Sequence, residues 1–312
     1  MKFIITVDVE ADNQWKNNNI GLENVKSLPH FQLLCEKYGF KPTYLLSYEV
    51  VEGANIDNLK DWENRGVAEI GSHLHPWTTP PYSKNHNINI HTYPHELEED
   101  NLVNKLESLT NIIKEKFNKQ PISFRAGRWG FDERVAEKIK RLGYEIDCSV
   151  TPKINWQKTV GDHNKNGGSD FRFNSIYPHD IQGILEVPMT ILFTGLLKKE
   201  NSKIAQLFLR LPESFFKKVV NRLFFKQKWL RIFSNSSTKD WEMIYKSAQE
   251  NNLPVLEFMI HSSELMIGGS PYSKDKKSFD FIYNQLEVMF KYFKEKDIEG
   301  ITLSDFRKYF NN

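Results

Sequence analysis

Short apolar runs alternate with helix-like patterns along most of this chain of 312 residues. The apolar runs have the length and β-branched content of buried strands, and the stretches between them repeat apolar residues every three or four positions. We predict strands at 3–7, 42–48, 67–72, 121–124, 144–146, 184–188, 254–260 and 298–303, and helices at 27–38, 57–64, 96–117, 132–142, 240–250 and 279–294. This alternation predicts an α/β fold, a distorted parallel (β/α) barrel of seven to eight strands.

The segment 196–231 interrupts the alternation. It holds ten basic and two acidic residues among large apolar side chains, although the net charge of the whole chain is only +2. A basic, aromatic-rich amphipathic stretch can bind peripherally at a membrane surface. It can also form a helical hairpin that packs on the barrel and keeps its basic face in solvent. We therefore expect one barrel domain over 1–312, with an inserted basic amphipathic segment at about 196–231 that has these two interpretations.

Composition narrows the classes of function. A hydrophobic content of 39% and a charged content of 26% are ordinary for a soluble globular protein, and a net charge of +2 gives no general case for nucleic-acid binding. Cys35 and Cys148 belong to no metal-type or redox-type cysteine pair, which fits a reducing compartment. The first apolar run is too short for a signal peptide, and no run is long enough to span a bilayer. We expect a cytoplasmic protein, with peripheral contact at the inner membrane face through 196–231 as the membrane interpretation.

Polar residues of catalytic type follow the predicted strands at the point where each strand ends. They are Asp8, Glu10, His73, His75, Arg125, Asp147 and His261. In parallel α/β barrels the carboxyl ends of the strands form one rim, and active sites are built there. Random polar residues would not gather at one rim, so this coincidence predicts a single active site.

The stretch from Glu69 to Trp77 carries a candidate metal site. His73 and His75 are two positions apart at the end of a predicted strand, so both imidazoles turn to the same face. An isolated His-x-His pair is more often structural. Here, however, carboxylates are predicted at the same rim, and a carboxylate with two histidines is a typical open ligand set for a catalytic Zn²⁺ ion.

The remaining rim residues supply the groups that hydrolysis needs. A bound divalent metal lowers the pKa of its water and polarises a carbonyl group. A second carboxylate can act as the base, and a histidine across the site can protonate the leaving group. Arg125 can hold the base carboxylate, and Asp147 can hold Arg125. Taken singly, Arg125 and Asp147 are more often members of an ordinary ion pair.

The order of these motifs resembles the polysaccharide deacetylases of carbohydrate esterase family 4. The similar stretches are Val7-Asp8-Val9-Glu10, Glu69-Ile-Gly-Ser-His73-Leu-His75, Phe124-Arg125-Ala-Gly-Arg128, Asp147-Cys-Ser-Val-Thr-Pro152 and Met259-Ile-His261. They span about residues 1–190 and 252–310. The resemblance implies a distorted barrel and metal-dependent removal of an N-acetyl or O-acetyl group from a sugar. It also implies that Asp8 is the base and His261 the acid. We further expect Trp77, Arg128 and Trp129 to contact the substrate.

Two departures from the family pattern affect the ligand set. Val9 stands where the first motif has a second aspartate, so Glu10 becomes the expected metal ligand. Trp77 stands where the second motif has its second histidine, so His75 is the expected second imidazole. The alternatives come from the loop that follows, and they are His86, His91 and His95.

Three functions are compatible with these residues. The first is a Zn²⁺-dependent deacetylase acting on a lipid-linked or nucleotide-linked sugar of a surface-polysaccharide or lipopolysaccharide precursor, a branch that the overall motif pattern resembles. The second is an allantoinase-like hydrolase of a small amide. The third is a non-catalytic carbohydrate-binding relative, although binding alone would not need base, acid and metal ligands together.

Overall fold

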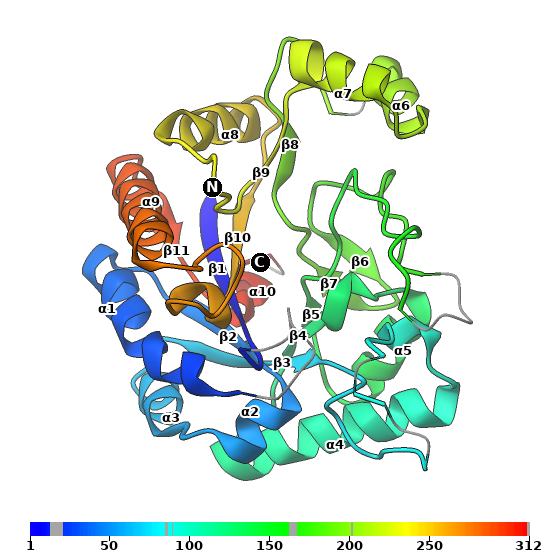
Figure 1. The fold of residues 1–312 in the computed structure, drawn as a ribbon, viewed down its shortest axis with the longest axis vertical. Coiled ribbons are helices and arrows are strands. Elements are labelled where there is room, and N and C mark those ends of the chain that lie inside the picture. The colour runs from blue at the N-terminus through cyan, green and yellow to red at the C-terminus, as the bar shows by residue number, and fades with distance from the viewer. Residues whose placement is uncertain (13–20, 85–86, 89, 162–166, 201, 311–312) are drawn as a thin grey trace.

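The computed structural model describes residues 1–12, 21–84, 87–88, 90–161, 167–200 and 202–310. Within them, nine strands form one curled sheet in the order β10-β1-β2-β3-β4-β5-β7-β6, with β11 paired to β1 (Figure 1). Every described pairing in this sheet is parallel except that of β6 with β7. The strands are β1 (Lys2–Val9), β2 (Pro42–Leu46), β3 (Glu69–Leu74), β4 (Ser123–Ala126), β5 (Ile146–Asp147), β6 (His179–Ile181), β7 (Ile184–Glu186), β10 (Val255–His261) and β11 (Glu299–Gly300).

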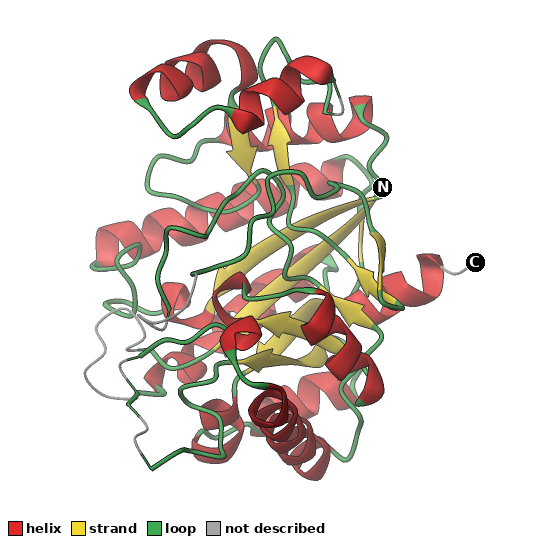
Figure 2. Ribbon diagram, turned by 90° about the vertical axis from the view of Figure 1, so that its right-hand side faces the viewer, coloured by secondary structure: helices red, strands yellow, loops and turns green. Residues whose placement is uncertain are grey.

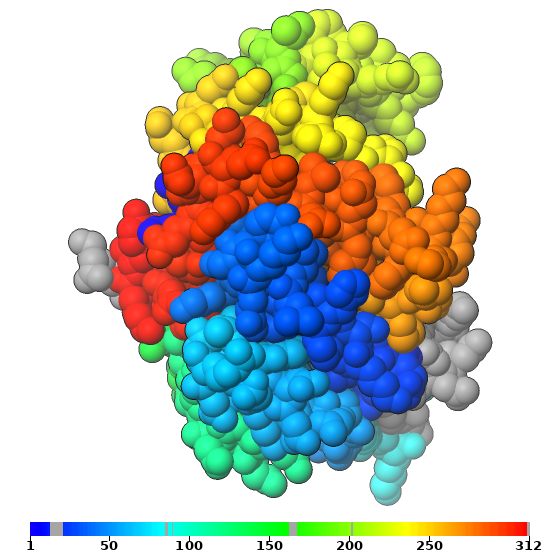
Figure 3. Space-filling model, turned by 90° about the vertical axis from the view of Figure 1, so that its left-hand side faces the viewer, coloured from blue at the N-terminus to red at the C-terminus, as the bar shows by residue number. Residues whose placement is uncertain are grey.

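Helices cover the outside of the sheet, as the sequence predicts for a (β/α) barrel (Figures 1 and 2). They are α1 (Leu28–Tyr38), α2 (Tyr48–Gly53), α3 (Asp57–Asn64), α4 (Glu99–Phe117), α5 (Glu133–Arg141), α8 (Thr238–Glu250), α9 (Lys276–Glu295) and α10 (Leu303–Phe310). Figure 3 shows the side of the molecule where the surfaces of α1, α3 and α9 lie next to one another. The predicted fold class is confirmed: the sheet curls into an incomplete barrel whose end strands, β6 and β10, are not paired with each other in the described part of the chain.

Strand β1, which lies between β10 and β2, is buried almost throughout because the sheet is covered on both faces. Phe3 packs edge-on against Phe40, Phe290 and Phe293, whose ring centroids lie 4.8–6.1 Å away. This aromatic cluster ties β1 to helix α9. The first strand of the chain is thereby fixed at the middle of the molecule, with its carboxyl end at the predicted rim.

Local signals in the sequence placed several helix ends correctly. The backbone of Gly39 is left-handed, with a φ of 73°, and ends α1 as predicted. The side chain of Asp132 accepts a hydrogen bond from the backbone N–H of Val135 and caps α5. Several boundaries were wrong. The strand predicted at 42–48 ends at Leu46, and the short helix α2, which we did not predict, starts at Tyr48. The strand predicted at 298–303 covers only Glu299–Gly300, and the helix α10, which we did not predict, starts at Leu303.

The inserted segment forms a small unit at one end of the molecule. Strands β8 (Ile191–Phe193) and β9 (Gln227–Trp229) pair antiparallel and lead to α6 (Lys203–Arg210), α7 (Phe215–Val220) and a π-helical turn at Asn221–Phe225. These helices stand at the top of Figures 1 and 3, beyond α8. No helix in the described ranges combines the length and the apolar character that crossing a bilayer requires.

Candidate active site

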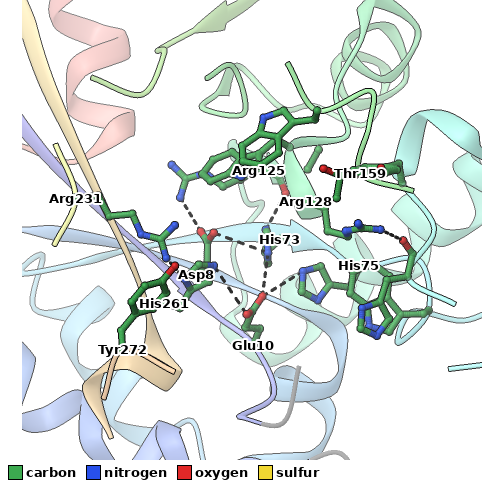
Figure 4. A pocket seen from close by; sticks show the side chains of 16 residues that line it. Asp8, Glu10, His73, His75, Arg125, Arg128, Thr159, Arg231, His261 and Tyr272 are labelled. Carbon is green, nitrogen blue, oxygen red and sulfur yellow. Dashed lines mark hydrogen bonds and ion pairs between the residues drawn. The ribbon is translucent and has the colours of Figure 1, made fainter. Parts of the chain in front are cut away.

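The side chains that the sequence placed at strand ends meet around one cavity of about 380 Å³ (Figure 4). Asp8 is the second-last residue of β1, and Glu10 comes directly after that strand, two positions from Asp8, so both carboxylates face the cavity. The lining residues are Asp8, Glu10, His73, His75, Trp77, His91, Tyr93, Arg125, Ala126, Arg128, Trp129, Trp156, Thr159, Arg231, His261 and Tyr272. Of the residues predicted for the site, only Asp147 does not line this cavity.

Asp8 is held by a buried arginine. The Nη1 group of Arg125 donates to Asp8 Oδ1 over 2.6 Å, and Asp8 Oδ2 lies 3.9 Å from His73 Nε2. Burial alone would raise the pKa of Asp8, but the charges of Arg125, His73 and His261 lower it below its ordinary value. Asp8 is therefore ionised at neutral pH.

The expected contact between Asp147 and Arg125 is not formed, and this prediction is wrong. Arg125 instead donates from Nη2 to Glu257 Oε1 on β10 over 2.7 Å and from Nε to the Cys148 carbonyl oxygen over 3.0 Å. Asp147 accepts hydrogen bonds from the backbone N–H and the hydroxyl of Ser149, and it does not line the cavity. The partner of Arg125 comes from a strand 132 residues further along the chain, so no local pattern could identify it.

Glu257 was missed by the sequence analysis because it lies inside an apolar strand. Its side chain is fully buried and accepts hydrogen bonds from Thr6 and Arg125. Burial raises its pKa to about 7, although Arg125 and Thr6 oppose the rise. A buried acid within an apolar run is itself a signal, since such residues are rarely buried without a partner.

Glu10, His73 and His75 converge as a ligand set. Their nearest donor atoms all lie within 4.8 Å of one another. Glu10 Oε2 is 3.4 Å from His73 Nε2 and 3.2 Å from His75 Nε2. His73 Nδ1 lies 3.1 Å from the Arg125 carbonyl oxygen, which orients the ring so that Nε2 faces Glu10.

Burial and neighbouring charges shift the pKa values of the two histidines in opposite directions. Burial, followed by the neighbouring charge of His73, lowers the pKa of His75 well below its ordinary value, so His75 is neutral. Burial would lower the pKa of His73, but Asp8 and Glu10 attract the imidazolium form. Their effect outweighs burial, and the pKa of His73 is raised above its ordinary value. A cation placed between these three residues would replace that imidazolium proton as the partner of the carboxylates.

The orientation of His75 depends on packing. Its ring stacks on Trp77 at 4.3 Å, and Trp77 stacks on His91 at 4.5 Å. Its other edge lies against Gly127, where a Cβ atom would overlap His75 Cδ2 and the Leu74 carbonyl oxygen. Glycine is therefore required in the Phe-Arg-Ala-Gly-Arg stretch so that β4 can approach the imidazole closely.

The loop histidines do not join the ligand set in the described part of the chain. His91 stacks on the far side of Trp77, and His95 forms a hydrogen bond of 3.0 Å from Nε2 to the Gly167 carbonyl oxygen. His86 lies outside the described residues. Among the described residues, His75 is thus the imidazole that accompanies His73.

His261 ends β10 on the opposite side of Glu10 from His75 (Figure 4). Its Nδ1 lies 2.7 Å from Glu264 Oε1, and its Nε2 faces the site, 4.0 Å from Glu10 Oε1. Glu264 also accepts from Arg231 Nη2 over 2.6 Å. Burial alone would raise the pKa of Glu264, but Arg231 and His261 lower it to about 2. No local pattern predicts the role of Glu264, and Arg231 enters the sequence-based prediction only as one of the basic residues of the segment 196–231.

Aromatic and cationic side chains form the rest of the wall. Trp129 stands over Arg125, with the guanidinium carbon 5.2 Å from the ring centroid. The guanidinium of Arg128 lies 4.2 Å from the ring centroid of Tyr93 and donates to the carbonyl oxygens of His91 and Val160. Arg128 and Trp129 both have positive φ values, 55° and 62°, an uncommon backbone that turns both side chains toward the cavity. Trp77, Arg128 and Trp129, for which we predict substrate contacts, thus all line the cavity.

Comparison with solved structures shows the fold. A protein from Mycobacterium smegmatis that is assigned as a polysaccharide deacetylase aligns over 99% of this chain and 89% of its own, with a TM-score of 0.56 and 10% identity. A 4-α-glucanotransferase from Thermococcus litoralis aligns over 98% of this chain, with a TM-score of 0.53 and 12% identity. This chain spans only 40% of that enzyme. A peptidoglycan deacetylase from Bacillus subtilis gives a TM-score of 0.42 at 9% identity over 98% of this chain and 90% of its own.

The shared architecture is the distorted (β/α) barrel found among polysaccharide deacetylases of carbohydrate esterase family 4. No family model matches the sequence, and no curated protein matches it. Because a glucanotransferase shares the barrel, the fold alone does not specify the reaction. The reaction depends on the residues of the site.

Proposed function

We propose that this protein is a metal-dependent hydrolase that removes an acetyl group from a sugar. The observation that carries the proposal is that a possible metal-ligand set, a carboxylate that can act as a base and a histidine that can act as an acid line one cavity. A carboxylate and two imidazoles converge within 4.8 Å, and Asp8 and His261 flank them. A buried binding site without catalysis would not need an ionised aspartate and a carboxylate-bound histidine beside the ligand set.

The residues fit a divalent metal. Glu10 Oε2 and the Nε2 atoms of His73 and His75 are the donors that would hold it, and this mixed nitrogen and oxygen set favours Zn²⁺. The orienting contact of His73 with the Arg125 carbonyl is of the kind that accompanies metal-bound histidines. When bound, the metal would supply Lewis acidity toward the acetyl carbonyl and toward water.

Asp8 is placed to act as the base. Arg125 occupies Oδ1, so Oδ2 is the oxygen that takes a proton from the attacking water. The two hydrogen-bonded carboxylates on Arg125, Asp8 and Glu257, fix the guanidinium and keep Asp8 in one orientation. Arg125 is thus a positioning residue in this proposal.

His261 is placed to act as the acid. Its Nδ1 atom is held by Glu264 Oε1 at 2.7 Å and Arg231 Nη2 at 2.9 Å, which leaves the Nε2 atom directed at the site to protonate the leaving nitrogen or oxygen of the sugar. Arg231 holds the same oxygen of Glu264. The base and the acid therefore approach the scissile bond from different strands, β1 and β10.

The substrate that we propose is an N-acetylated sugar of a surface-polysaccharide or lipopolysaccharide precursor, linked to a lipid or a nucleotide, at the cytoplasmic side of a membrane. Its support is the wall of the cavity, where Trp129, Trp156, Tyr93 and Tyr272 offer apolar faces on which sugar rings can stack, beside the cations of Arg128 and Arg231. These cations would suit the phosphate of such a precursor. Neither the net charge nor the site gives a reason to propose nucleic acid as a partner.

Metal analysis and acetate release together test the proposal. The purified protein, loaded with Zn²⁺, is incubated with N-acetylated sugars as free, nucleotide-linked and lipid-linked forms, and with small amides such as allantoin. Acetate release from a sugar, abolished in Asp8→Asn, supports the deacetylase. Hydrolysis of small amides alone would assign the allantoinase-like reaction, and saturable sugar binding without turnover would assign the non-catalytic function.

A further inference from the structure

The inserted unit exposes large apolar side chains to an unusual degree. Of the seventeen large hydrophobic residues that are exposed in the described part of the chain, eight lie between positions 196 and 224. Six of them define what we call the apolar tip: Ile204, Leu207, Phe215, Phe216, Leu223 and Phe224, with exposed fractions of 42–83%. Large apolar side chains exposed together in one short segment indicate a surface that contacts another apolar phase or molecule.

The apolar tip is the outer side of a unit whose inner side is already packed. Phe193, Phe208 and Phe225 are buried against one another, with ring centroids 4.1–5.8 Å apart. A hairpin folded flat on the barrel would bury Phe215 and Phe216 as well, but these two are 83% and 64% exposed. The barrel therefore does not provide the partner of the apolar tip.

The elements that carry the apolar tip also carry cations without acidic partners in the described structure. Six basic side chains of the unit are exposed and form no ion pair with a described residue: Lys199, Lys203, Arg210, Lys218, Arg222 and Lys226. On α6, Lys203, Leu207 and Arg210 share one face because they are four and three positions apart. Of the two acids in the segment, Glu200 is buried against Lys153, and Glu213 is paired with Lys217.

We propose that the apolar tip and its six cations dock this protein on an anionic lipid bilayer. Aromatic and aliphatic side chains enter the headgroup region, and the lysines and arginines meet the lipid phosphates. Exposed apolar side chains together with exposed lysines favour a bilayer over a protein as the partner, since protein interfaces are depleted of lysine at their cores. The docking itself does not depend on the reaction proposed above.

Docking at the apolar tip would also position the cavity, because strand β9 connects the inserted unit to the cavity wall. The chain leaves the π-helical turn at Phe225, forms β9, and reaches Arg231, which lines the cavity and holds Glu264. Trp229 on β9 lies 6.1 Å from Trp129 and 6.5 Å from Trp156, both in the cavity wall. Docking would thus keep the cavity at a fixed position relative to the bilayer, where a lipid-borne substrate is presented.

Co-sedimentation with vesicles tests the inference. The full chain is mixed with vesicles of phosphatidylcholine alone or with added phosphatidylglycerol, at salt concentrations below and above ~0.1 M, where charges are screened over ~10 Å. We expect binding to the anionic vesicles at low salt and at least about tenfold weaker binding at high salt or without the anionic lipid.

Two pairs of substitutions separate the apolar and the charged contribution. The double variant Phe215→Ala with Phe216→Ala, and the double variant Lys218→Glu with Arg222→Glu, should each weaken binding at least about tenfold. Matched controls at other exposed positions, Tyr309→Ala with Phe310→Ala and Lys114→Glu with Lys116→Glu, should bind as the wild type does. Asp8→Asn should also bind fully, which keeps this test independent of catalysis.

Several results would overturn the inference. These are no binding to anionic vesicles at low salt, equal binding to neutral vesicles, or equal losses in the matched controls. Self-association that depends on Phe215 and Phe216 in a protein that ignores vesicles would also overturn it, because a second copy of the chain would then cover the apolar tip.

Discussion

At the scale of single residues, the site is defined by which atom of each side chain is already occupied. Arg125 takes Oδ1 of Asp8, the Arg125 carbonyl takes Nδ1 of His73, and Glu264 takes Nδ1 of His261. In each case one atom is fixed by the protein and the other is turned toward the cavity. This division explains how Asp8 and Glu10, two residues apart on one strand end, can be assigned different roles.

The roles proposed for Asp8 and His261 can be tested separately from folding. Asp8→Asn and His261→Ala are each expected to lower kcat by about 10²–10⁴, the usual contribution of a general base or acid. Circular dichroism and metal content should match the wild type, because neither residue belongs to the proposed ligand set. An Asp8→Asn enzyme with wild-type kcat would require another base, with Glu10 the first to examine.

The metal site leads to a second residue-scale prediction. His73→Ala and His75→Ala should each lose most of the bound metal, since each removes one of three donors. His91→Ala is the matched control, because its imidazole lies beyond Trp77 and should leave the metal content unchanged. Elemental analysis after dialysis measures all three. Full metal occupancy in His75→Ala together with loss in His91→Ala would reverse the assignment of the second imidazole.

At the scale of elements, the close approach of β3 and β4 shapes the ligand set. These strands pair in parallel, with His73 opposite Arg125, so the residue after β4 lies against the ring of His75. Only glycine leaves room for that ring at position 127. The Phe124-Arg125-Ala-Gly-Arg128 stretch would therefore contribute to the proposed metal site through a missing side chain as well as through Arg125.

Gly127→Ala should lower metal affinity by about 10–100-fold, the range observed when a group that orients a metal ligand is changed. The added methyl group would displace the His75 ring, and the fold around the sheet should be retained. Gly53→Ala is a suitable control, because a methyl group there would meet only the flexible end of Leu22. Competition with a metallochromic chelator gives both affinities. Equal affinities in the two variants would contradict the role assigned to this glycine.

At the scale of the whole molecule, the contact of Arg231 with Glu264 and His261 connects the inserted unit to the barrel. Glu264 is fully buried, and its pKa of about 2 lies well below the ordinary value of 4.5. A carboxyl group whose pKa falls on folding stabilises the folded state above pH 4.5, and this contribution is lost as the pH falls toward 2.

Glu264→Gln should therefore be less stable than the wild type at pH 7, and this difference should narrow by about 2 kcal/mol between pH 7 and pH 3. Urea denaturation at several pH values measures the unfolding free energy of the wild type and of Glu264→Gln. Subtracting the two free energies at each pH cancels the titration of groups that both proteins share. Glu213→Gln, at an exposed side chain of the inserted unit, should show no such narrowing. A constant difference for Glu264→Gln would contradict the low pKa.

The sequence by itself determined the features that depend on neighbours along the chain. Strand and helix periods, the glycine that ends α1 and the Asp132 cap follow from local backbone and side-chain preferences. The rim was also predictable, because parallel strands place their carboxyl ends at one edge and residues two apart share a face. This is why Asp8, Glu10, His73 and His75 could be grouped before their distances were known.

Only the tertiary structure decided the contacts between distant segments. Arg125 pairs with Glu257, 132 residues away, and not with Asp147. The reason is that the curl of the sheet brings β10 next to β1 and across from β4. Glu264 and Arg231 meet because β9 returns from the inserted unit toward the end of β10. The amphipathic pattern of 196–231 indicated an apolar face but could not show which aromatic residues pack inward. That depends on the volume available beside Phe193 and Phe225, a property of the assembled fold.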